Sequence, residues 1–260
     1  SIVNRVWLYH FGQGLVDSPN DFGRGGQLPT HPQLLDWLAA DFRDNGQSLK
    51  RLHRLICLSA TYRQSSAPNP ENAKRDANNR LLWRMNRRRL TAEEIRDSEL
   101  AVSGQLRTDM GGPGFQDFLI EKPQHSPHYE YDKASPEDVR IHRRAIYRFI
   151  VRSQPQPMMT VLDCADPARS VPKRDETLTP LQSLSLMNNP FPLAMAEQFA
   201  SRLEHEFPTR DQQLTHAYWL VLARRPTSQE LGDLKSFTHQ FGLPATCRLL
   251  FNLNEFLFVD

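Results

Sequence analysis

The sequence predicts a mainly α-helical fold, a multi-helix orthogonal bundle with a small β element near residues 115–153. Three observations predict this class. Apolar residues recur at helical spacing through most of the chain. Several of these runs are preceded by a threonine with Glu or Gln three residues later, the pattern of a capping box. A period-two alternation of apolar and polar residues, typical of a strand, is confined to one segment.

The first quarter of the chain predicts three helices. Residues 2–11 form a short helix that the "GQG" at 12–14 interrupts. Thr30 is expected to cap a second helix, with Pro32 in its first turn and the "DNG" at 44–46 as its end. Ser48 starts a third helix, whose apolar residues share one side. The polar stretch 65–79 predicts a loop.

The middle of the chain combines one clear helix with irregular structure. The Thr91/Glu94 capping box starts a helix that runs to about Leu106. Residues 107–142 are rich in Gly, Pro and charge, which predicts a long irregular excursion. Residues 143–153 alternate Arg with apolar residues and predict a strand. A lone strand is not stable, so its partner is either 115–122 or a strand in another part of a longer parent protein.

The last third predicts helices again. A short helix opens at Pro180, a second covers 191–206, and capping boxes recur at Thr209/Gln212 and Thr227/Glu230. A final helix begins at about Pro244. No repeat of solenoid period is found. We therefore expect residues 1–260 to form a single domain, and the start at Ser1 within a helix suggests a fragment of a longer protein.

Composition excludes some classes of protein. The chain has 39% hydrophobic and 24% charged residues, as soluble globular proteins do. Its longest apolar runs, such as "LICL" at 55–58, fall far short of the roughly 18 residues that cross a bilayer. A net charge of +2 gives no reason to expect nucleic acid. We predict neither a membrane span in this segment nor a nucleic-acid partner.

Arginine and cysteine usage carries further information. The chain has 26 Arg and 6 Lys, which indicates either a G+C-rich genome or oxyanion binding, since guanidinium pairs bidentately with carboxylate, sulfate or phosphate. Its three cysteines are distant in sequence and no C-x-x-C-H pattern is present, so the segment carries no c-type haem of its own. Cys57 and Cys247 lie on helical apolar patterns and are expected to be small buried hydrophobic residues.

The first candidate site is the opening stretch, "NRVWLYHFGQGLVDSPNDFGRGG". His10 or His31 could serve as a general base or a metal ligand, or could be a hydrogen-bonded core residue. No Ser, Cys or Thr nucleophile is visibly paired with either histidine. The loop with its Asp, Asn and Gly residues suits a chain reversal held by side-chain-to-backbone bonds, bordering a site. The candidate residues in this stretch are Arg5, His10, Asp21, Arg24 and His31.

The second candidate site is the arginine cluster in "NRLLWRMNRRRL". Its guanidinium groups could hold a polyanion while Trp83 stacks on a sugar or base, or they could form ion pairs with neighbouring helices. The backbone of "MGGPG" could present amides to an anion, although no strand and helix flank it. The candidate residues in the cluster are Arg80, Trp83, Arg87 and Arg88.

No metal site is predicted, and no nucleotide-binding or nucleophile-elbow motif is present. The nearest approach to a metal cluster is His125, His128, Glu130 and Asp132, which prolines place in a loop more typical of solvated surface. Gln182, Asn188 and Asn189 flank an apolar helix, where buried amides would fix chain crossings.

Long strings of the sequence resemble the planctomycete-associated domain of unknown function 1553. They occur in the family's order and cover nearly the whole chain. Leu8 and Tyr9 stand where that family often has Gln and His, which weakens the idea of a tandem-histidine site. The strings are "VNRVW", "HFGQGLV", "PNDFG", "PTHPQLLDWLA", "SLKRLHRLICLSATYRQSS", "NRLLWRMNRRRLTAEEIRD", "MGGP", "TPLQSLSLMNNPF", "RRPTSQEL" and "NEFLFVD".

The resemblance implies the kind of parent protein to which the chain belongs, but it identifies no catalytic residues. Such domains form the C-terminal part of large exported proteins that also carry a cytochrome c-like module, often near sulfatases and glycan-degrading enzymes. It implies an extracytoplasmic location, with haem c in another domain of the parent protein. Our leading hypothesis is a non-catalytic interaction or scaffold domain that packs against the cytochrome c-like and adjoining domains. The alternative is a carbohydrate-active or redox enzyme domain acting on acidic or sulfated glycans, with the candidate residues above lining its pocket.

Overall fold

The computed structural model describes residues 1–121 and 127–259, which form two compact units. Unit 1 contains residues 1–88 and 171–173 with the last residues of the chain. Unit 2 contains residues 89–170 and 174–257. About half of the described chain is helical, in twelve helices, and the strands are few and short, so the predicted mainly α fold is confirmed. That the two units make one domain stays a prediction.

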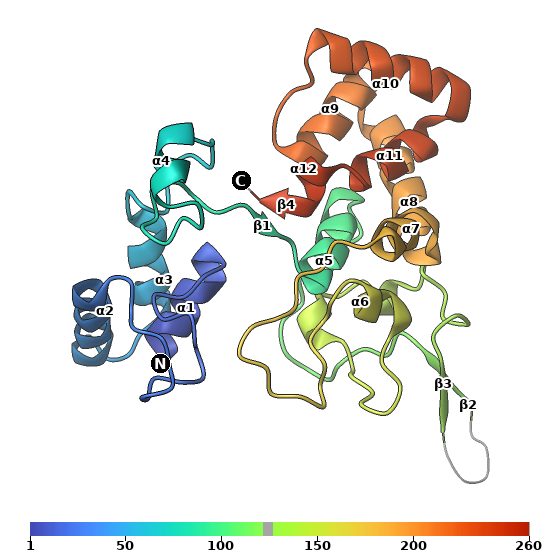
Figure 1. The fold of residues 1–260 in the computed structure, drawn as a ribbon. Helices are drawn as coiled ribbons and strands as arrows, with labels where there is room; N and C mark the ends of the chain where they lie inside the picture. Colours follow the sequence, from blue (N-terminus) through green and yellow to red (C-terminus); the bar gives the residue numbers. More distant parts are fainter. Residues whose placement is uncertain (122–126, 260) are drawn as a thin grey trace. The chain divides into compact units, whose positions relative to one another are not determined.

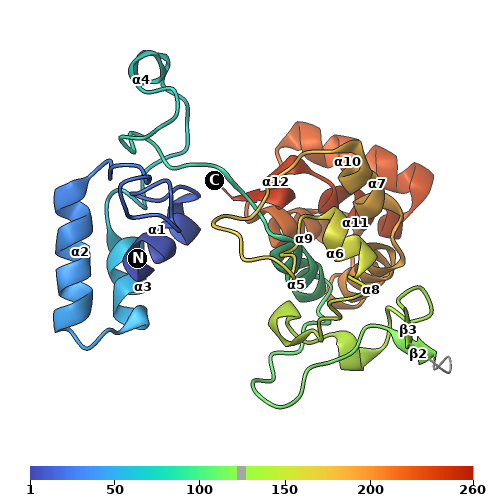
Figure 2. The same ribbon diagram turned by 60° about the horizontal axis from the view of Figure 1, so that its bottom comes forward.

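Unit 1 is built on three helices that lie side by side in both views of the ribbon (Figures 1 and 2). These are α1 (Ile2–Phe11), α2 (Pro32–Asp44) and α3 (Leu49–Leu58). Their facing sides share one apolar core, and burial of that core drives this unit to fold. The core includes Val3, Val6, Trp7, Phe11, Leu15, Leu38, Leu52 and Ile56.

The ends of these helices follow the sequence with two exceptions. Ser48 caps α3 by accepting the Arg51 N–H, as expected. The N-cap of α2 is His31, and its side chain makes no cap bond. Thr30 instead bonds the Leu15 carbonyl and anchors the preceding loop. The predicted loop at 65–79 contains a helix, α4 (Pro70–Arg75), because Asn69 caps its first turn and Pro70 presets its backbone.

Unit 2 has its core between α8 (Pro190–Glu206) and α11 (Leu243–Phe251). Phe199 of α8 and Phe251 of α11 stack with ring centroids 5.9 Å apart, and both are fully buried. Six more helices surround this pair, and Figure 1 shows their arrangement. They are α5 (Ala92–Val102), α6 (Pro157–Val161), α7 (Pro180–Asn188), α9 (Arg210–Leu222), α10 (Ser228–Phe241) and α12 (Asn254–Leu257).

Capping boxes start several of these helices. The reciprocal boxes Thr91/Glu94 and Thr227/Glu230 are both present. Thr209 caps α9 by accepting the Gln212 N–H. A third reciprocal box, Thr179/Gln182, starts α7 and was not anticipated from the sequence. Each cap satisfies backbone donors that a helix start otherwise leaves free, which explains why these boundaries were readable.

Strand structure is limited to short pairs. β2 (Leu119–Glu121) pairs antiparallel with β3 (His128–Glu130), with Ile120 opposite Tyr129. A second pair joins β1 (Arg88–Arg89) and β4 (Phe258–Val259). The described residues of the 107–142 segment are otherwise irregular, apart from the 3₁₀ turn η1 (Val139–Ile141). The small β element expected near residues 115–153 is therefore present as the β2–β3 hairpin.

The prediction of a strand at 143–153 was wrong. The segment forms a 3₁₀ turn, η2 (Ala145–Tyr147), and meets Phe115 through an isolated bridge. The Asp97 carboxylate accepts the Ala145 N–H, and the Tyr147 N–H bonds the nearby Arg144 carbonyl. These partners, one of them distant in sequence, take the donors that a sheet ladder needs.

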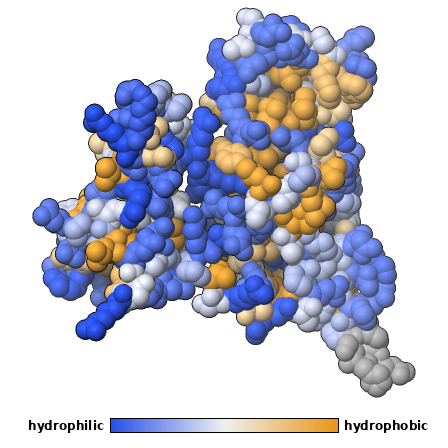
Figure 3. Space-filling view, viewed as in Figure 1, coloured by the Kyte–Doolittle hydropathy of each residue, from blue (hydrophilic) through white to orange (hydrophobic). Residues whose placement is uncertain are grey.

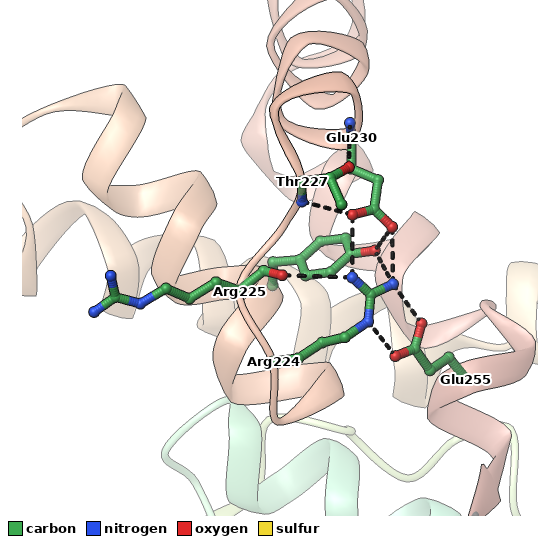
Figure 4. A network of polar contacts seen from close by, with 6 residues as sticks. Arg224, Arg225, Thr227, Glu230 and Glu255 are labelled. Carbon is green, nitrogen blue, oxygen red and sulfur yellow. Dashed lines mark hydrogen bonds and ion pairs between the residues drawn. The ribbon is translucent and has the colours of Figure 1, made fainter.

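A polar network ties the turn between α9 and α10 to α12 (Figure 4). Arg224 contacts Glu230 at 2.8 Å and Glu255 at 2.5 Å, and its guanidinium lies 4.9 Å from the centroid of the Tyr218 ring. The Tyr218 hydroxyl also donates to Glu230. Burial, and then the hydrogen bond to Glu230, raises the pKa of Tyr218 to about 12. The "RRPTSQEL" motif therefore has a structural role in unit 2.

Within the described residues, we find no helix that is both long and apolar enough to span a bilayer.

Candidate functional site

Three side chains of unit 1 form a contiguous hydrogen-bonding series, which we name the Cys57–His10–His53 cluster. His10 Nε2 lies 2.8 Å from His53 Nδ1. His10 Nδ1 lies 4.0 Å from the Cys57 Sγ. The Tyr62 ring meets the His10 ring edge-on, with centroids 5.4 Å apart. His10 therefore sits between a thiol and a second imidazole.

Helix geometry explains this placement. His53 and Cys57 are four residues apart on α3 and so lie on the same face, one turn from each other. His10 lies in the last turn of α1, next to Phe11, which is buried in the unit 1 core. Packing of α1 against α3 brings the imidazole of His10 between the two α3 side chains.

The surroundings of His10 favour its neutral form. Partial burial, the neighbouring His53 and the positive charge of Arg88 all lower the pKa of His10 below 6.5. His10 is therefore mainly neutral at pH 7, with one nitrogen a donor and the other an acceptor. If Nε2 carries the proton and donates to His53, Nδ1 is free to accept from the Cys57 thiol.

The cluster is not arranged to hold a metal ion. His10 uses different ring nitrogens toward His53 and Cys57, so the three side chains do not converge on one point. Over residues 1–121 and 127–259 the structure shows no group of three His, Cys, Asp or Glu side chains suited to a metal. His125, part of the loop considered for metal binding, lies outside the described residues.

The arginine cluster lies against the end of α1. The Asn86 amide donates to the Phe11 carbonyl at 3.0 Å, which places the neighbouring Arg88 within electrostatic reach of His10. The Trp83 indole donates to the Asp76 carbonyl at 2.9 Å, and the Arg84 guanidinium lies 5.2 Å from its ring centroid. The structure thus brings together one residue from each of the two predicted sites, His10 and Arg88.

The other candidate residues make local contacts or face solvent. Arg5 donates to the Asn20 side chain, and the Asp21 carboxylate accepts the Gly23 N–H at 2.8 Å. His31 Nδ1 lies 2.9 Å from the Thr30 hydroxyl. These bonds hold the loop as a chain reversal, as the sequence indicated. Exposed positions are occupied by Arg24, Arg80 and Arg87, and Arg87 also has contacts within the chain.

Two sequence-based expectations about cysteine and histidine were wrong. Cys57 was expected to be a buried hydrophobic residue, but its side chain is only half-buried and lies beside His10. No nucleophile was expected to be paired with His10. The available signal was the spacing of His53 and Cys57 on one helix face, which becomes informative only when the position of α1 is known. Cys247 is fully buried, as predicted.

Unit 2 contains a separate buried charge cluster around Arg96 of α5. The Arg96 guanidinium donates to the carbonyls of Ile141 and Arg143, the latter at 2.9 Å. It lies between the rings of Phe115 and Phe191, with 5.0 Å to each centroid. Arg96 therefore connects α5 to α8 and to the backbone of residues 141–143.

Buried carboxyl groups accompany Arg96. Glu99 has no exposed surface, and among the described residues neither of its carboxyl oxygens has a hydrogen-bond partner. Burial raises the pKa of Glu99 to about 8, although the charge of Arg96 acts in the opposite direction. Burial also raises the pKa of Asp97 and of Asp117. Glu99 is therefore inaccessible to a substrate here, and the contacts of Arg96 give the cluster a structural role.

Two other sequence features also have structural roles. The carbonyls of Asp109, Gly111 and Pro113 around "MGGPG" accept from the Arg143 guanidinium, so this loop surrounds an internal cation and the suggested anion site was wrong. Gln182 is buried and accepts from Arg89 at 2.9 Å, and Asn189 caps α8. Gln182 therefore fixes a chain crossing, as predicted, whereas Asn188 is exposed and Asn189 is half-buried.

The family described as "Protein of unknown function (DUF1553)" matches residues 1–238. The chain belongs to this family. The DUF1553 match covers the Cys57–His10–His53 cluster and the Arg96 cluster and ends before α11. No curated protein and no solved structure matches the chain.

Proposed function

We propose that this DUF1553 chain is an interaction domain whose docking surface is the outer face of α7. The observation that carries the proposal is a row of exposed apolar side chains. Leu181, Leu184 and Met187 are 59%, 55% and 43% exposed, and Leu178 just before the helix is 75% exposed. Their spacing of three residues places them on one side of the helix.

A helix that carries apolar side chains on two opposite faces is normally packed against protein on both of them. The opposite face of α7 already packs into unit 2 through Leu186 and Gln182, which are 1% and 3% exposed. A surface helix usually presents polar residues to water, whereas a helix that is apolar all round is usually buried. Figure 3 shows apolar side chains gathered over the part of unit 2 where α7 lies. Contiguous exposed apolar surface of this kind is typical of protein contact sites.

The partner we propose is the cytochrome c-like domain of the same parent protein, outside the cytoplasm. The resemblance in the sequence supports this choice, because it implies that DUF1553 domains accompany such a module. Haem c would then be held by the partner, and the present chain would supply the contact surface.

The test is calorimetric titration of the purified chain with the purified cytochrome c-like domain. A triple variant, Leu181→Ser, Leu184→Ser and Met187→Ser, removes the apolar row. We expect at least a tenfold weaker association, because each well-packed apolar anchor contributes on the order of 1 kcal/mol. The matched control replaces exposed leucines of unit 1, Leu58→Ser with Leu81→Ser, and should bind as tightly as the parent sequence. Equal affinity of the triple variant would exclude α7 as the docking surface.

A second proposed function is action on acidic or sulfated glycans at the end of α1. It is supported by the closeness of a mainly neutral His10, able to act as a base, to the cationic Arg88. Guanidinium groups of the same segment, including Arg80 and Arg87, would add attraction for sulfate or carboxylate.

We expect saturable, salt-sensitive binding of a sulfated oligosaccharide in calorimetry, weakened several-fold by Arg88→Ala because one cation is lost. Arg75→Ala, an exposed arginine of α4, serves as the control and should leave the affinity unchanged. Absence of binding to sulfated and neutral glycans alike would remove this second function.

A further inference from the structure

The Cys57–His10–His53 cluster has the order of groups found where a thiol acts as a nucleophile. A nucleophile, a base within reach of its proton and a third group that orients the base are the three parts of such a site. Here the thiol of Cys57 faces Nδ1 of His10 at 4.0 Å, and Nε2 of His10 faces His53 at 2.8 Å. The cluster belongs to unit 1 and α7 belongs to unit 2, and the cluster shares no residue with the proposed docking surface.

The His10–His53 contact fixes the direction of the base. Their ring centroids are 5.0 Å apart while the two nitrogens are only 2.8 Å apart, so the nitrogens lie between the rings and point at each other. When Nε2 of His10 donates to His53 Nδ1, the unprotonated Nδ1 of His10 is held toward the sulfur. His53 is exposed, so its far nitrogen can exchange protons with water.

The surroundings keep His10 available as a base. The groups that face it are His53 and Cys57 from α3, Tyr62 after α3, and Arg88. Burial and the charge of Arg88 disfavour the imidazolium form, so the base is free at neutral pH. Cys57 itself is half-buried, and any reaction at this thiol requires that a small reagent reach its sulfur.

We propose that Cys57 is a reactive thiol, with His10 as its general base and His53 as the positioning residue, and that it exchanges with small organic disulfides. In this step a new S–S bond forms between Cys57 and one sulfur of the reagent, and the S–S bond of the reagent breaks. His10 takes the proton from Cys57 and passes it to the departing sulfur, which leaves as a thiol. The Cys57 sulfur is oxidised as the released sulfur is reduced, so no other oxidant is required.

The same chain supplies internal comparisons. Cys164 is also half-buried, but burial raises its pKa and its side-chain hydrogen-bond partner is Thr160. Cys247 is fully buried, and burial raises the pKa of its thiol strongly. Reaction at Cys57 can therefore be separated from general thiol reactivity within a single sample.

The experiment follows reaction of the whole chain with dithiodipyridine, a neutral aromatic disulfide that releases a coloured product, and assigns the modified cysteine by peptide mass spectrometry. At pH 7 we expect Cys57 to react at least about tenfold faster than Cys164. Between pH 6.5 and 8 its rate should change little, whereas the rate of Cys164 should rise steeply with pH, as that of an unassisted thiol does. At pH values low enough to protonate His10 the advantage of Cys57 should disappear.

Two variants test the assigned roles. His10→Gln should bring the rate of Cys57 down to that of Cys164, and His53→Gln should give an intermediate rate with a shifted pH profile. Lys50→Gln, an exposed change on the same helix, should have no effect. Circular dichroism of each variant checks folding, and the pH profile of the unaltered chain tests the proposal without any substitution. A Cys57 rate no faster than that of Cys164, or one unaffected by His10→Gln in a folded chain, would overturn it.

Discussion

Replacing Glu99 by glutamine is expected to raise the midpoint of thermal unfolding by about 10 °C or more at pH 8.5 and to leave it nearly unchanged at pH 4. The reason is the fully buried carboxyl group. Its pKa is about 8 in the folded chain and 4.5 in the unfolded reference, so the folded state holds a proton that the unfolded state releases. Glutamine has a similar shape and carries no ionisable proton.

The direction in which stability changes with pH follows from the order of these two pKa values. Stability associated with protonated Glu99 is fully present below pH 4.5, falls as the pH rises, and is lost above about pH 8. A difference of 3.5 pKa units, from 4.5 to 8, corresponds to about 5 kcal/mol. The measurement is calorimetric unfolding at several pH values. Glu197→Gln, an exposed change on α8, is the control. Parallel pH curves for Glu99→Gln and the unaltered chain would show that Glu99 is not the group that titrates.

Replacing Arg96 by methionine is expected to destabilise unit 2 by about 3–5 kcal/mol at pH 7. Methionine preserves much of the contact with Phe115 and Phe191, but it cannot donate to the carbonyls of Ile141 and Arg143. It also removes one of the positive charges that partly offset the burial of Asp117, the larger contribution being that of Arg148. Breaking one side of a buried ionic cluster costs more than the cluster contributes when intact.

Urea unfolding monitored by circular dichroism measures this loss, and hydrogen exchange of residues 139–145 locates it. Arg144→Met is the matched control, because Arg144 is exposed in the same segment. We expect the control to differ from the unaltered chain by less than about 0.5 kcal/mol. If Arg96→Met proved as stable as Arg144→Met, apolar packing between the two rings would be sufficient and the ionic contacts unnecessary.

The fold was most readable from the sequence where the signal is local. Thr91 with Glu94 and Thr227 with Glu230 mark helix starts because the cap bonds join residues three apart. The failure at 143–153 has a nonlocal cause, since Asp97, nearly fifty residues earlier, takes the Ala145 N–H. An alternating pattern cannot show that such a partner exists.

The residues of the candidate site were likewise only partly predictable from the sequence. His10 and Arg88 could be singled out by residue type, and the structure places them near each other. The partners of His10 could not be recognised, because His53 and Cys57 read as ordinary positions of an amphipathic helix until α1 is packed against it. The Arg96 cluster was missed for a related reason, since the one Arg and the three Glu of α5 give no sign in the sequence that Arg96 and Glu99 are buried.

The Arg224 network and α11 limit where a recombinant fragment of this chain can end. The family match ends at residue 238, yet Cys247, Leu250 and Phe251 lie in the core of unit 2, and Glu255 pairs with Arg224. A recombinant fragment that stopped at the family boundary would lack these residues and expose Phe199 to water. The folding boundary of the DUF1553 chain therefore lies beyond residue 238, where the family match ends, and expression designs should extend past α12.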